Sequence, residues 1–139
     1  MFRNLVRYIA TLAVIGLAVM AGFSIAAKYS APASEIAMLP HFCYAQYVDN
    51  VSGPEYTIHD CGPIVNHYCP ALLELQRAQK AIGVKKKGER LQHLQVAKRD
   101  TLYTLNGIKG FPNCPIRQHV ESTLMQVNTL LNVYGHGQE

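Results

Sequence analysis

The sequence predicts an all-α fold in which three antiparallel helices follow an irregular segment that disulfide bonds fasten. Apolar residues recur every three or four positions over three stretches between Ile64 and Tyr134, which is the period of an amphipathic helix. No stretch alternates apolar and polar residues as a half-buried strand does. The connections between the three stretches are short, so consecutive helices are expected to lie antiparallel around a shared core.

The first predicted helix ends at Gly83, with basic residues nearby. Pro70 lies inside its apolar pattern, and proline is best tolerated in the first helical turn. The regular helix is therefore expected to start near Cys69 and Pro70, after a turn that contains His67 and Tyr68. The apolar face of this helix consists of Ile64, Tyr68, Leu72, Leu75, Ala78 and Ile82.

The second and third predicted helices run from about Gly88 to Gly107 and from Pro115 to Gly135. In the third, proline suits the first helical position and glycine ends the helix. The expected apolar stripe of the second helix is Leu91, Leu94, Ala97, Leu102, Leu105 and Ile108. The cleaner stripe of the third helix is Ile116, Val120, Leu124, Val127, Leu131 and Tyr134.

Residues 34–62 are expected to form an irregular wrap, and residues 63–139 the helical domain. The wrap contains prolines, glycines and a Ser-Gly-Pro break, and no helical period persists in it. Its tyrosines are expected to cover the helices. The alternative is a patch that binds a partner, since tyrosine is enriched at interfaces. The residues of this alternative patch are Tyr44, Tyr47, Tyr56 and His67.

Residues 1–33 have the features of a secretory signal peptide or an N-terminal membrane anchor. Arg3 and Arg7 precede an uncharged apolar run over residues 8–27, and small residues follow. A run of this length also suffices to span a bilayer. A cleaved leader and a retained anchor that contacts the membrane through residues 8–27 both fit. In either case the rest of the chain is expected to be exported, in the periplasm or outside the cell.

The charge of the chain is concentrated in the leader. The sequence has 13 Lys and Arg against 9 Asp and Glu, and Arg3, Arg7 and Lys28 belong to residues 1–33. The exported part is therefore nearly neutral, and no nucleic-acid partner is expected, because nucleic-acid binding needs a concentrated basic face. The one dense basic patch, residues 85–90, is expected to be a solvated turn, with an anionic partner as the alternative.

Three of the four cysteines stand in the same frame of a histidine, one intervening residue and a cysteine. The pairs are His41 and Cys43, His59 and Cys61, and His67 and Cys69. Imidazole and thiolate are preferred ligands of zinc and copper, so one hypothesis is a metal site built from these six residues. An oxidising exterior pairs cysteines instead. We therefore expect two disulfides among Cys43, Cys61, Cys69 and Cys114, for which sequence alone permits three connectivities.

Short motifs flank and enter the first helix. They are Leu39-Pro40 followed by Cys43, then His67-Tyr68-Cys69, then Arg77-Ala78. With these motifs, most of the exported chain resembles exported bacterial proteins with tetratricopeptide-like helical hairpins. The resemblance implies a hairpin plus one further helix, because the chain is too short for a stacked array of such repeats. It also implies a disulfide between Cys43 and Cys69, which leaves Cys61 to pair with Cys114.

What such helical hairpins imply for function is protein–protein binding. The chain contains no nucleophile-elbow, zinc-protease, haem-attachment or phosphate-loop motif, so we expect no enzyme, no catalytic residue and no cofactor. The expected function is that of a structural or protein-binding protein, an adaptor or an accessory subunit of a cell-envelope or membrane complex. One alternative is a periplasmic copper or zinc carrier that uses the histidine–cysteine pairs. Another is a self-assembling subunit of a surface filament.

Overall fold

The computed structural model describes residues 29–135, which form helices and connecting turns and contain no strand. The predicted all-α fold is confirmed. The apolar run over residues 8–27 lies outside this part of the chain. Within 29–135, no helix has the length and apolar character needed to cross a membrane.

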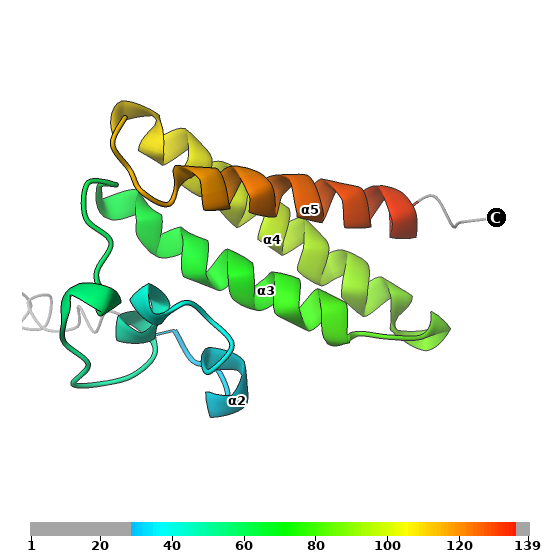
Figure 1. Cartoon of the computed structure of the whole chain (residues 1–139). Helices are drawn as coiled ribbons and strands as arrows, with labels where there is room; N and C mark the ends of the chain where they lie inside the picture. The colour runs from blue at the N-terminus through cyan, green and yellow to red at the C-terminus, as the bar shows by residue number, and fades with distance from the viewer. Residues whose placement is uncertain (1–28, 136–139) are drawn as a thin grey trace, which may run out of the picture.

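Three long helices follow a segment of short helical turns (Figure 1). The segment consists of α2 (Ala33–Ile36), η1 (His41–Gln46), η2 (Pro54–Tyr56) and η3 (Pro63–His67). The long helices are α3 (Tyr68–Lys80), α4 (Lys87–Gly107) and α5 (Arg117–Gly135), and the turns η4 (Val84–Lys86) and η5 (Ile108–Gly110) connect them.

The first long helix differs from its prediction at both ends. It begins at Tyr68, because Pro70 then lies in the first turn, where backbone N–H groups have no partner within the helix. It ends at Lys80, and Gly83 follows with a φ of 98° that favours glycine. Ile82, which was expected on the buried face, therefore lies beyond the helix and is 77% exposed.

The second long helix buries a different stripe from the one predicted. Leu94 and Ala97 are buried as expected, but Leu102 is exposed, and Thr101 and Thr104 take its place in the interior. Both hydroxyls are satisfied within the helix, since each donates to the carbonyl four residues earlier, at 2.7 Å for Thr101 and 2.9 Å for Thr104. Small side chains at these positions suit a helix that has neighbours on two sides.

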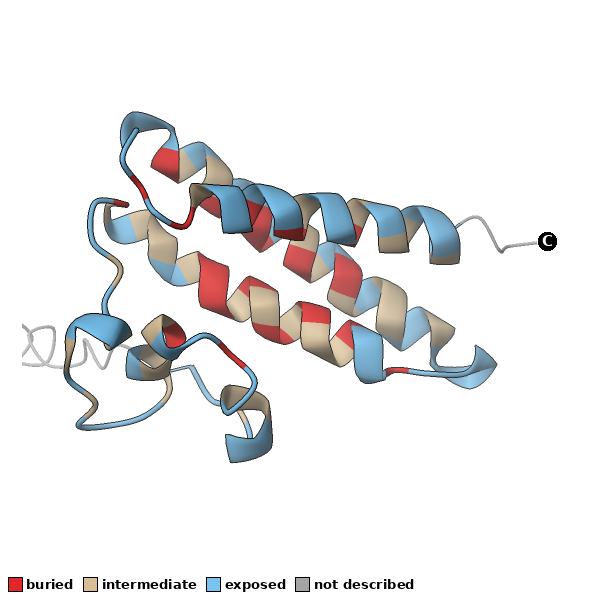
Figure 2. Ribbon diagram, viewed as in Figure 1, coloured by how far each residue is buried: buried red, intermediate tan, exposed pale blue. Residues whose placement is uncertain are grey.

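α4 is the central helix of the bundle. It packs against α3 along one side and α5 along the other, whereas α3 and α5 touch each other little. In Figure 1, α3 and α5 lie in front of α4 and run in the same direction. Figure 2 shows the buried residues gathered where α3 and α5 face α4. This arrangement leaves the space between α3 and α5 to be filled by side chains alone.

The core is divided between the two ends of the bundle. The cluster at the end where α3 and α5 begin contains Cys61, Tyr68, Ile108, Cys114, Ile116 and Val120. The cluster toward the opposite end contains Leu75, Ala78, Leu94, Ala97 and Val127, two of which are alanines. A third, smaller cluster joins the wrap to α3 through Leu39, Cys43 and Cys69. The first end is therefore filled by larger side chains than the second.

Candidate functional site

The four cysteines form two disulfides, Cys43–Cys69 and Cys61–Cys114, with S–S distances of 2.04 and 2.01 Å. The prediction of two disulfides is confirmed, and the pairs are those that the resemblance implied. The first bond ties η1 to the start of α3, and the second ties the wrap to the residues just before α5. Two disulfides in one small domain indicate an oxidising, exported environment.

The six-residue metal site is not formed. Its three sulfur donors, Cys43, Cys61 and Cys69, are committed to disulfide bonds, and a disulfide sulfur offers no thiolate to a metal. His41 instead has its ring 5.2 Å from that of Tyr44, and His59 is exposed. No group of three or more metal-ligating side chains occurs within the described part of the chain. The metal-carrier hypothesis therefore loses the site on which it was based.

The tyrosines of the wrap are half-buried and form two groups. Tyr44 and Tyr56 have ring centroids 6.2 Å apart, and His41 lies beside both. The Tyr47 ring centroid lies 6.1 Å from that of Tyr29, and both Tyr44 and Tyr47 pack against the cluster that contains the Cys43–Cys69 bond. Neighbouring residues therefore cover part of each ring, and the role of these tyrosines in partner binding stays a prediction.

His67 lies away from the tyrosines with which it was grouped. Its ring contacts that of Tyr103 on α4, with centroids 4.5 Å apart. The structure thus places His67 against α4, whereas the rings of Tyr44 and Tyr56 contact each other and His41. A role of His67 in partner binding stays a prediction.

A groove between α3 and α5 brings together residues that the sequence did not group. One side is a stripe of α3 that contains Leu72, Leu75, Gln76 and Gln79, and the other is a stripe of α5 that contains His119, Thr123, Gln126, Leu130 and Val133. These spacings of three and four residues place each stripe on one helix face. The groove contains a pocket at each end, and because Gln79 lines both, the pockets lie along the same face.

The pocket near the wrap has a volume of about 370 Å³. Met38, Pro40 and Phe42 from the wrap close one side of it. At its base, the hydroxyls of Tyr68 and Thr123 form a buried hydrogen bond of 2.9 Å that joins α3 directly to α5. Burial raises the pKa of the Tyr68 phenol, and the hydrogen bond to Thr123 opposes this in part. This hydrogen bond joins the two helices beside the smaller of the two pockets.

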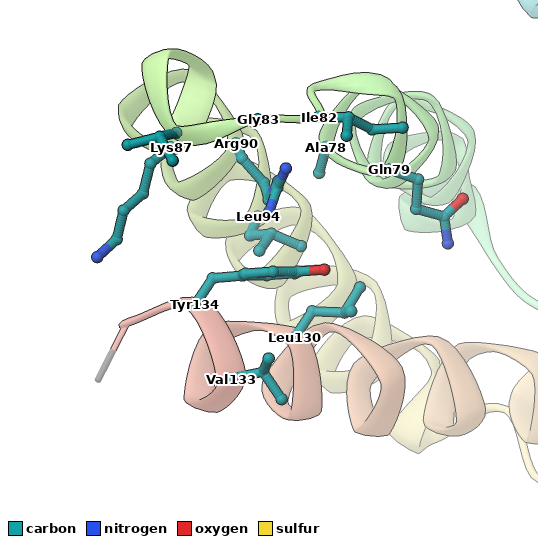
Figure 3. A pocket seen from close by; sticks show the side chains of 11 residues that line it. Ala78, Gln79, Ile82, Gly83, Lys87, Arg90, Leu94, Leu130, Val133 and Tyr134 are labelled. Atoms are coloured by element: carbon teal, nitrogen blue, oxygen red, sulfur yellow. The ribbon is translucent and has the colours of Figure 1, made fainter. Parts of the chain in front are cut away.

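The second pocket, which we call the open-end pocket, is larger, at about 720 Å³ (Figure 3). Its lining residues are Ala78, Gln79, Ile82, Gly83, Val84, Lys87, Arg90, Leu94, Leu130, Val133 and Tyr134. They come from the end of α3, the α3–α4 connection, the start of α4 and the end of α5. Three of the aliphatic side chains are largely exposed: Ile82 at 77%, Val84 at 92% and Val133 at 62%. The pocket therefore exposes apolar surface from two separate segments, the α3–α4 connection and the end of α5.

Arg90 holds this end of the bundle together. Its Nε donates to the Ala81 carbonyl at 2.7 Å, Nη2 donates to the same oxygen, and its guanidinium lies 4.1 Å from the centre of the Tyr134 ring. One side chain of α4 thus caps the end of α3 and stacks on the end of α5. It sets the distance between the two walls of the open-end pocket.

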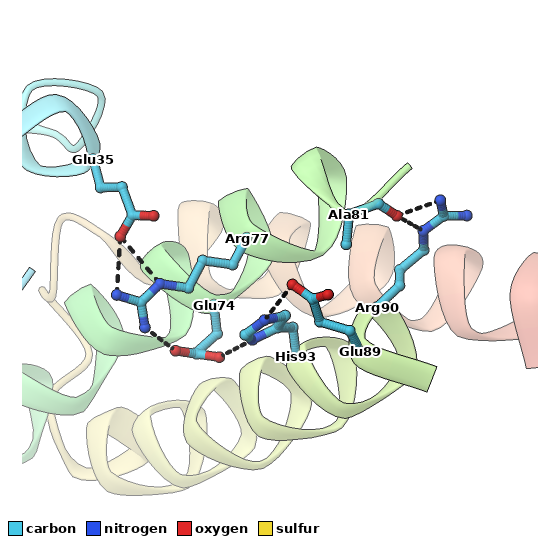
Figure 4. A network of polar contacts seen from close by, with 7 residues as sticks. All are labelled: Glu35, Glu74, Arg77, Ala81, Glu89, Arg90 and His93. Atoms are coloured by element: carbon cyan, nitrogen blue, oxygen red, sulfur yellow. Dashed lines mark hydrogen bonds and ion pairs between the residues drawn. The ribbon is translucent and has the colours of Figure 1, made fainter. Parts of the chain in front are cut away.

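A chain of ion pairs occupies the opposite face of α3 (Figure 4). Arg77 pairs with Glu35 of α2 at 2.9 Å and with Glu74 at 2.7 Å, and Glu74 also meets His93 Nδ1 of α4 at 2.6 Å. Glu74 and Arg77 lie about half a turn away from Leu72 and Gln79 around the helix. The network therefore fastens α2 and α4 to α3 and keeps its carboxylates away from the groove.

Sequence reasoning missed the open-end pocket. It placed Ile82, Leu131 and Tyr134 on faces that other helices cover, and it treated residues 85–90 as a solvated turn. One signal was available in the sequence. The apolar stripe of α5 continues to Tyr134, whereas the first helix, which was expected to pack beside it, was expected to end near Gly83. Comparisons with protein-family models, curated proteins and solved structures found no match for the chain.

Proposed function

We propose that this is an exported, non-enzymatic protein that binds a segment of a protein partner along the groove between α3 and α5. The observation that carries the proposal is the groove itself, with pockets of about 370 and 720 Å³ at its two ends. Concave sites of this size with a mostly apolar lining are where proteins hold side chains of a ligand or partner.

The lining of the groove suits an extended or helical segment of a protein. The amide side chains of Gln76 and Gln126 line the smaller pocket, and that of Gln79 lines both; such amides can donate to and accept from a partner backbone. The apolar residues of the two pockets can take side chains of the same segment. An interface of this kind, with apolar anchors and a few polar contacts, is typical of protein–protein recognition.

We place the protein in the periplasm or at the cell surface, as an adaptor or an accessory subunit of an envelope complex. The two disulfides support an exported location. If the leader is retained, residues 8–27 anchor the chain in the inner membrane, and the protein is a single-span subunit whose groove faces the periplasm.

A pair of glutamines tests the groove. Gln126 lines the groove on α5, whereas Gln95 is exposed on α4 and lines neither pocket. We would replace each in turn by a photo-activated crosslinking residue in cells and irradiate the intact envelope. We expect a covalent adduct with one other protein from position 126 and none from position 95.

Two other outcomes would contradict the proposal. Adducts of equal yield from both positions, or from neither, would mean that the groove does not hold the partner. An adduct with a second copy of this chain, together with sedimentation that depends on concentration, would favour the self-assembling filament subunit instead.

A further inference from the structure

The basic residues of the described chain are concentrated at one end of the bundle. With His neutral, residues 77–90 contain six Lys and Arg against one acidic residue, Glu89, which is a formal charge of +5. The other residues between 29 and 135 contain four Lys and Arg against seven Asp and Glu, which is a formal charge of −3. The exported part is nearly neutral as a whole, but its charges are segregated. Such a distribution orients a domain with its basic end toward a negatively charged surface.

The exposed part of this positive charge lies in the connection between α3 and α4. Lys80 ends α3, Lys85 and Lys86 belong to the turn η4, and all three are exposed. We call residues 80–86 the basic tip, and no acidic residue occurs in it. In Figure 1 this connection forms the outermost turn of the bundle at its end. The lysines of the basic tip can therefore reach a flat surface from the end of the bundle.

The basic tip also carries the two most exposed large apolar side chains of residues 29–135. Ile82 is 77% exposed and Val84 is 92% exposed. A Cβ added at Gly83, between them, would meet no atom of the described chain within 4 Å, so this turn stands clear of the helices. A single exposed aliphatic side chain is ordinary. Two of them among three exposed lysines have the composition of a segment that enters the surface of a bilayer.

The apolar and the basic side chains of the tip line separate pockets. The two aliphatic side chains line the open-end pocket, whereas Lys80 and Lys86 line a separate polar pocket of about 320 Å³. Glu35 and Glu89 share this polar pocket, but Glu35 is paired with Arg77 at 2.9 Å. Lysine stems are long enough for the ammonium groups to stay at the level of lipid phosphates while neighbouring aliphatic side chains lie deeper.

We propose that the basic tip binds the surface of a lipid bilayer that carries anionic headgroups. Ile82 and Val84 enter the boundary between the headgroups and the acyl chains, and the three lysines of the tip contact the phosphates. This contact goes beyond the proposed function, because the groove between α3 and α5 can hold a partner whether or not the tip meets a membrane.

The absence of tryptophan from the chain makes a direct test possible, since one introduced Trp reports on its own surroundings. We would introduce it into the oxidised full chain as Val84→Trp and, in a matched chain, as Met125→Trp at a position of α5 that is 68% exposed. Vesicles of phosphatidylcholine are compared with vesicles that also contain phosphatidylglycerol, both with brominated acyl chains that quench Trp on contact. We expect a blue shift and quenching at position 84 in the anionic vesicles alone, and neither signal at position 125.

The reporter separates the tip from the leader. Residues 8–27 carry no charge, so their insertion should be alike in the neutral and the anionic vesicles. Insertion of that segment does not by itself bring position 84 into contact with lipid. A signal from position 84 that depends on anionic lipid therefore belongs to the tip.

Two pairs of variants of the Val84→Trp chain test the two parts of the contact. Lys85→Glu should lower the ratio of quenched to unquenched Trp about tenfold, whereas the same reversal at exposed Lys109, at the other end of the bundle, should leave it unchanged. Ile82→Ser should also lower this ratio about tenfold, and Met125→Ser should not change it. Added salt should weaken the contact, because the lysines are exposed. Far-UV circular dichroism should show the same helical content in all variants.

The proposal is overturned if position 84 is not quenched in anionic vesicles, or if it is quenched equally in neutral ones. Equal quenching at positions 84 and 125, or tip variants that behave like their controls, would overturn it as well. None of these results affects the crosslinking from Gln126, which tests the groove without vesicles, so either proposal can fail alone.

Discussion

The two ends of the three-helix bundle are held by different kinds of contact. At the end where α3 and α5 begin, the Cys61–Cys114 disulfide ties the wrap to the residues just before α5, and the Tyr68–Thr123 hydrogen bond joins α3 to α5. Large side chains fill the core there. At the end where α3 and α5 terminate, Arg90 links the three helices around a pocket of about 720 Å³. We call these the fastened end and the open end.

The stabilising cross-links and the cluster of exposed aliphatic side chains lie at different ends of the bundle. A small exported domain gains much of its stability from cross-links, and here they lie at the fastened end or in the wrap beside it. With one end fixed covalently, the other tolerates exposed aliphatic side chains and an unfilled pocket. The open end is therefore where the fold has room for a partner.

Removing the Cys61–Cys114 disulfide, which belongs to the fastened end, should cause the largest loss of stability. The bond joins residues 53 positions apart, and the loop-entropy estimate for such a loop is about 4 kcal/mol. We expect the Cys61→Ser/Cys114→Ser double variant to lose about that much free energy of unfolding, measured by urea titration with far-UV circular dichroism.

The Cys43→Ser/Cys69→Ser double variant is the matched control. Its bond, across 26 positions, fastens the wrap to α3 and does not contact α5. This variant should lose order mainly in the wrap, seen as faster amide hydrogen exchange from residues 39–47, while exchange in α4 and α5 stays slow. Equal loosening of α5 in both variants would mean that the fastened end is not defined by Cys61–Cys114.

Replacing Arg90 should have the second largest effect on stability, and its structural consequence should be confined to the open end. Arg90→Met keeps a long apolar stem but removes the charged hydrogen bonds to Ala81 and the stacking on Tyr134, at a cost of about 2 to 3 kcal/mol. Lys109→Met is the control, since Lys109 is exposed at the other end of the bundle and a surface substitution of this kind changes stability by about 0.5 kcal/mol or less. Thermal unfolding of the two variants compares them directly, and equal losses would remove Arg90 from its linking role.

The sequence predicted which segments are helices better than it predicted which residues of those helices are buried. The periods of α3 and α5 identify helices with one buried face each, and those helices are present. The stripe of α4 was wrong at Leu102, Thr101 and Thr104, because a helix between two others buries small polar residues whose hydroxyls bond to its own backbone. Apolar periodicity does not detect such residues.

The candidate site was harder to predict for a related reason. Periodicity assigns Leu131 and Tyr134 to an apolar face, but it does not say whether a helix covers that face or leaves it open. Contacts such as Tyr68 to Thr123, 55 positions apart, fix the separation of α3 and α5 and have no local pattern. The histidine–cysteine pairs were conspicuous in sequence, yet disulfide bonding accounts for their cysteines.

The smallest predicted effect is a loss of stability at alkaline pH that is localised to the wrap beside the fastened end. Burial raises the pKa of Tyr47 from its ordinary value of 10.0 to about 12, and the nearby Tyr29 phenol adds to the shift. Below pH 10 the folded and unfolded chains both keep this proton. Between pH 10 and 12 the unfolded chain releases it while the folded chain retains it, so the free energy of unfolding falls by about 1 to 2 kcal/mol.

Tyr47→Phe isolates this contribution. The Tyr47 hydroxyl is buried without a hydrogen-bond partner in the described part of the chain, so its removal should leave stability at pH 7 unchanged or slightly higher. The variant should also lose less stability than the natural chain between pH 10 and 12, measured by urea unfolding at each pH. Tyr68 is buried too, with its pKa raised, so some alkaline loss should persist in the variant. An unchanged pH profile would show that Tyr47 is solvated, and that the wrap packs against α3 less closely than the Cys43–Cys69 region indicates.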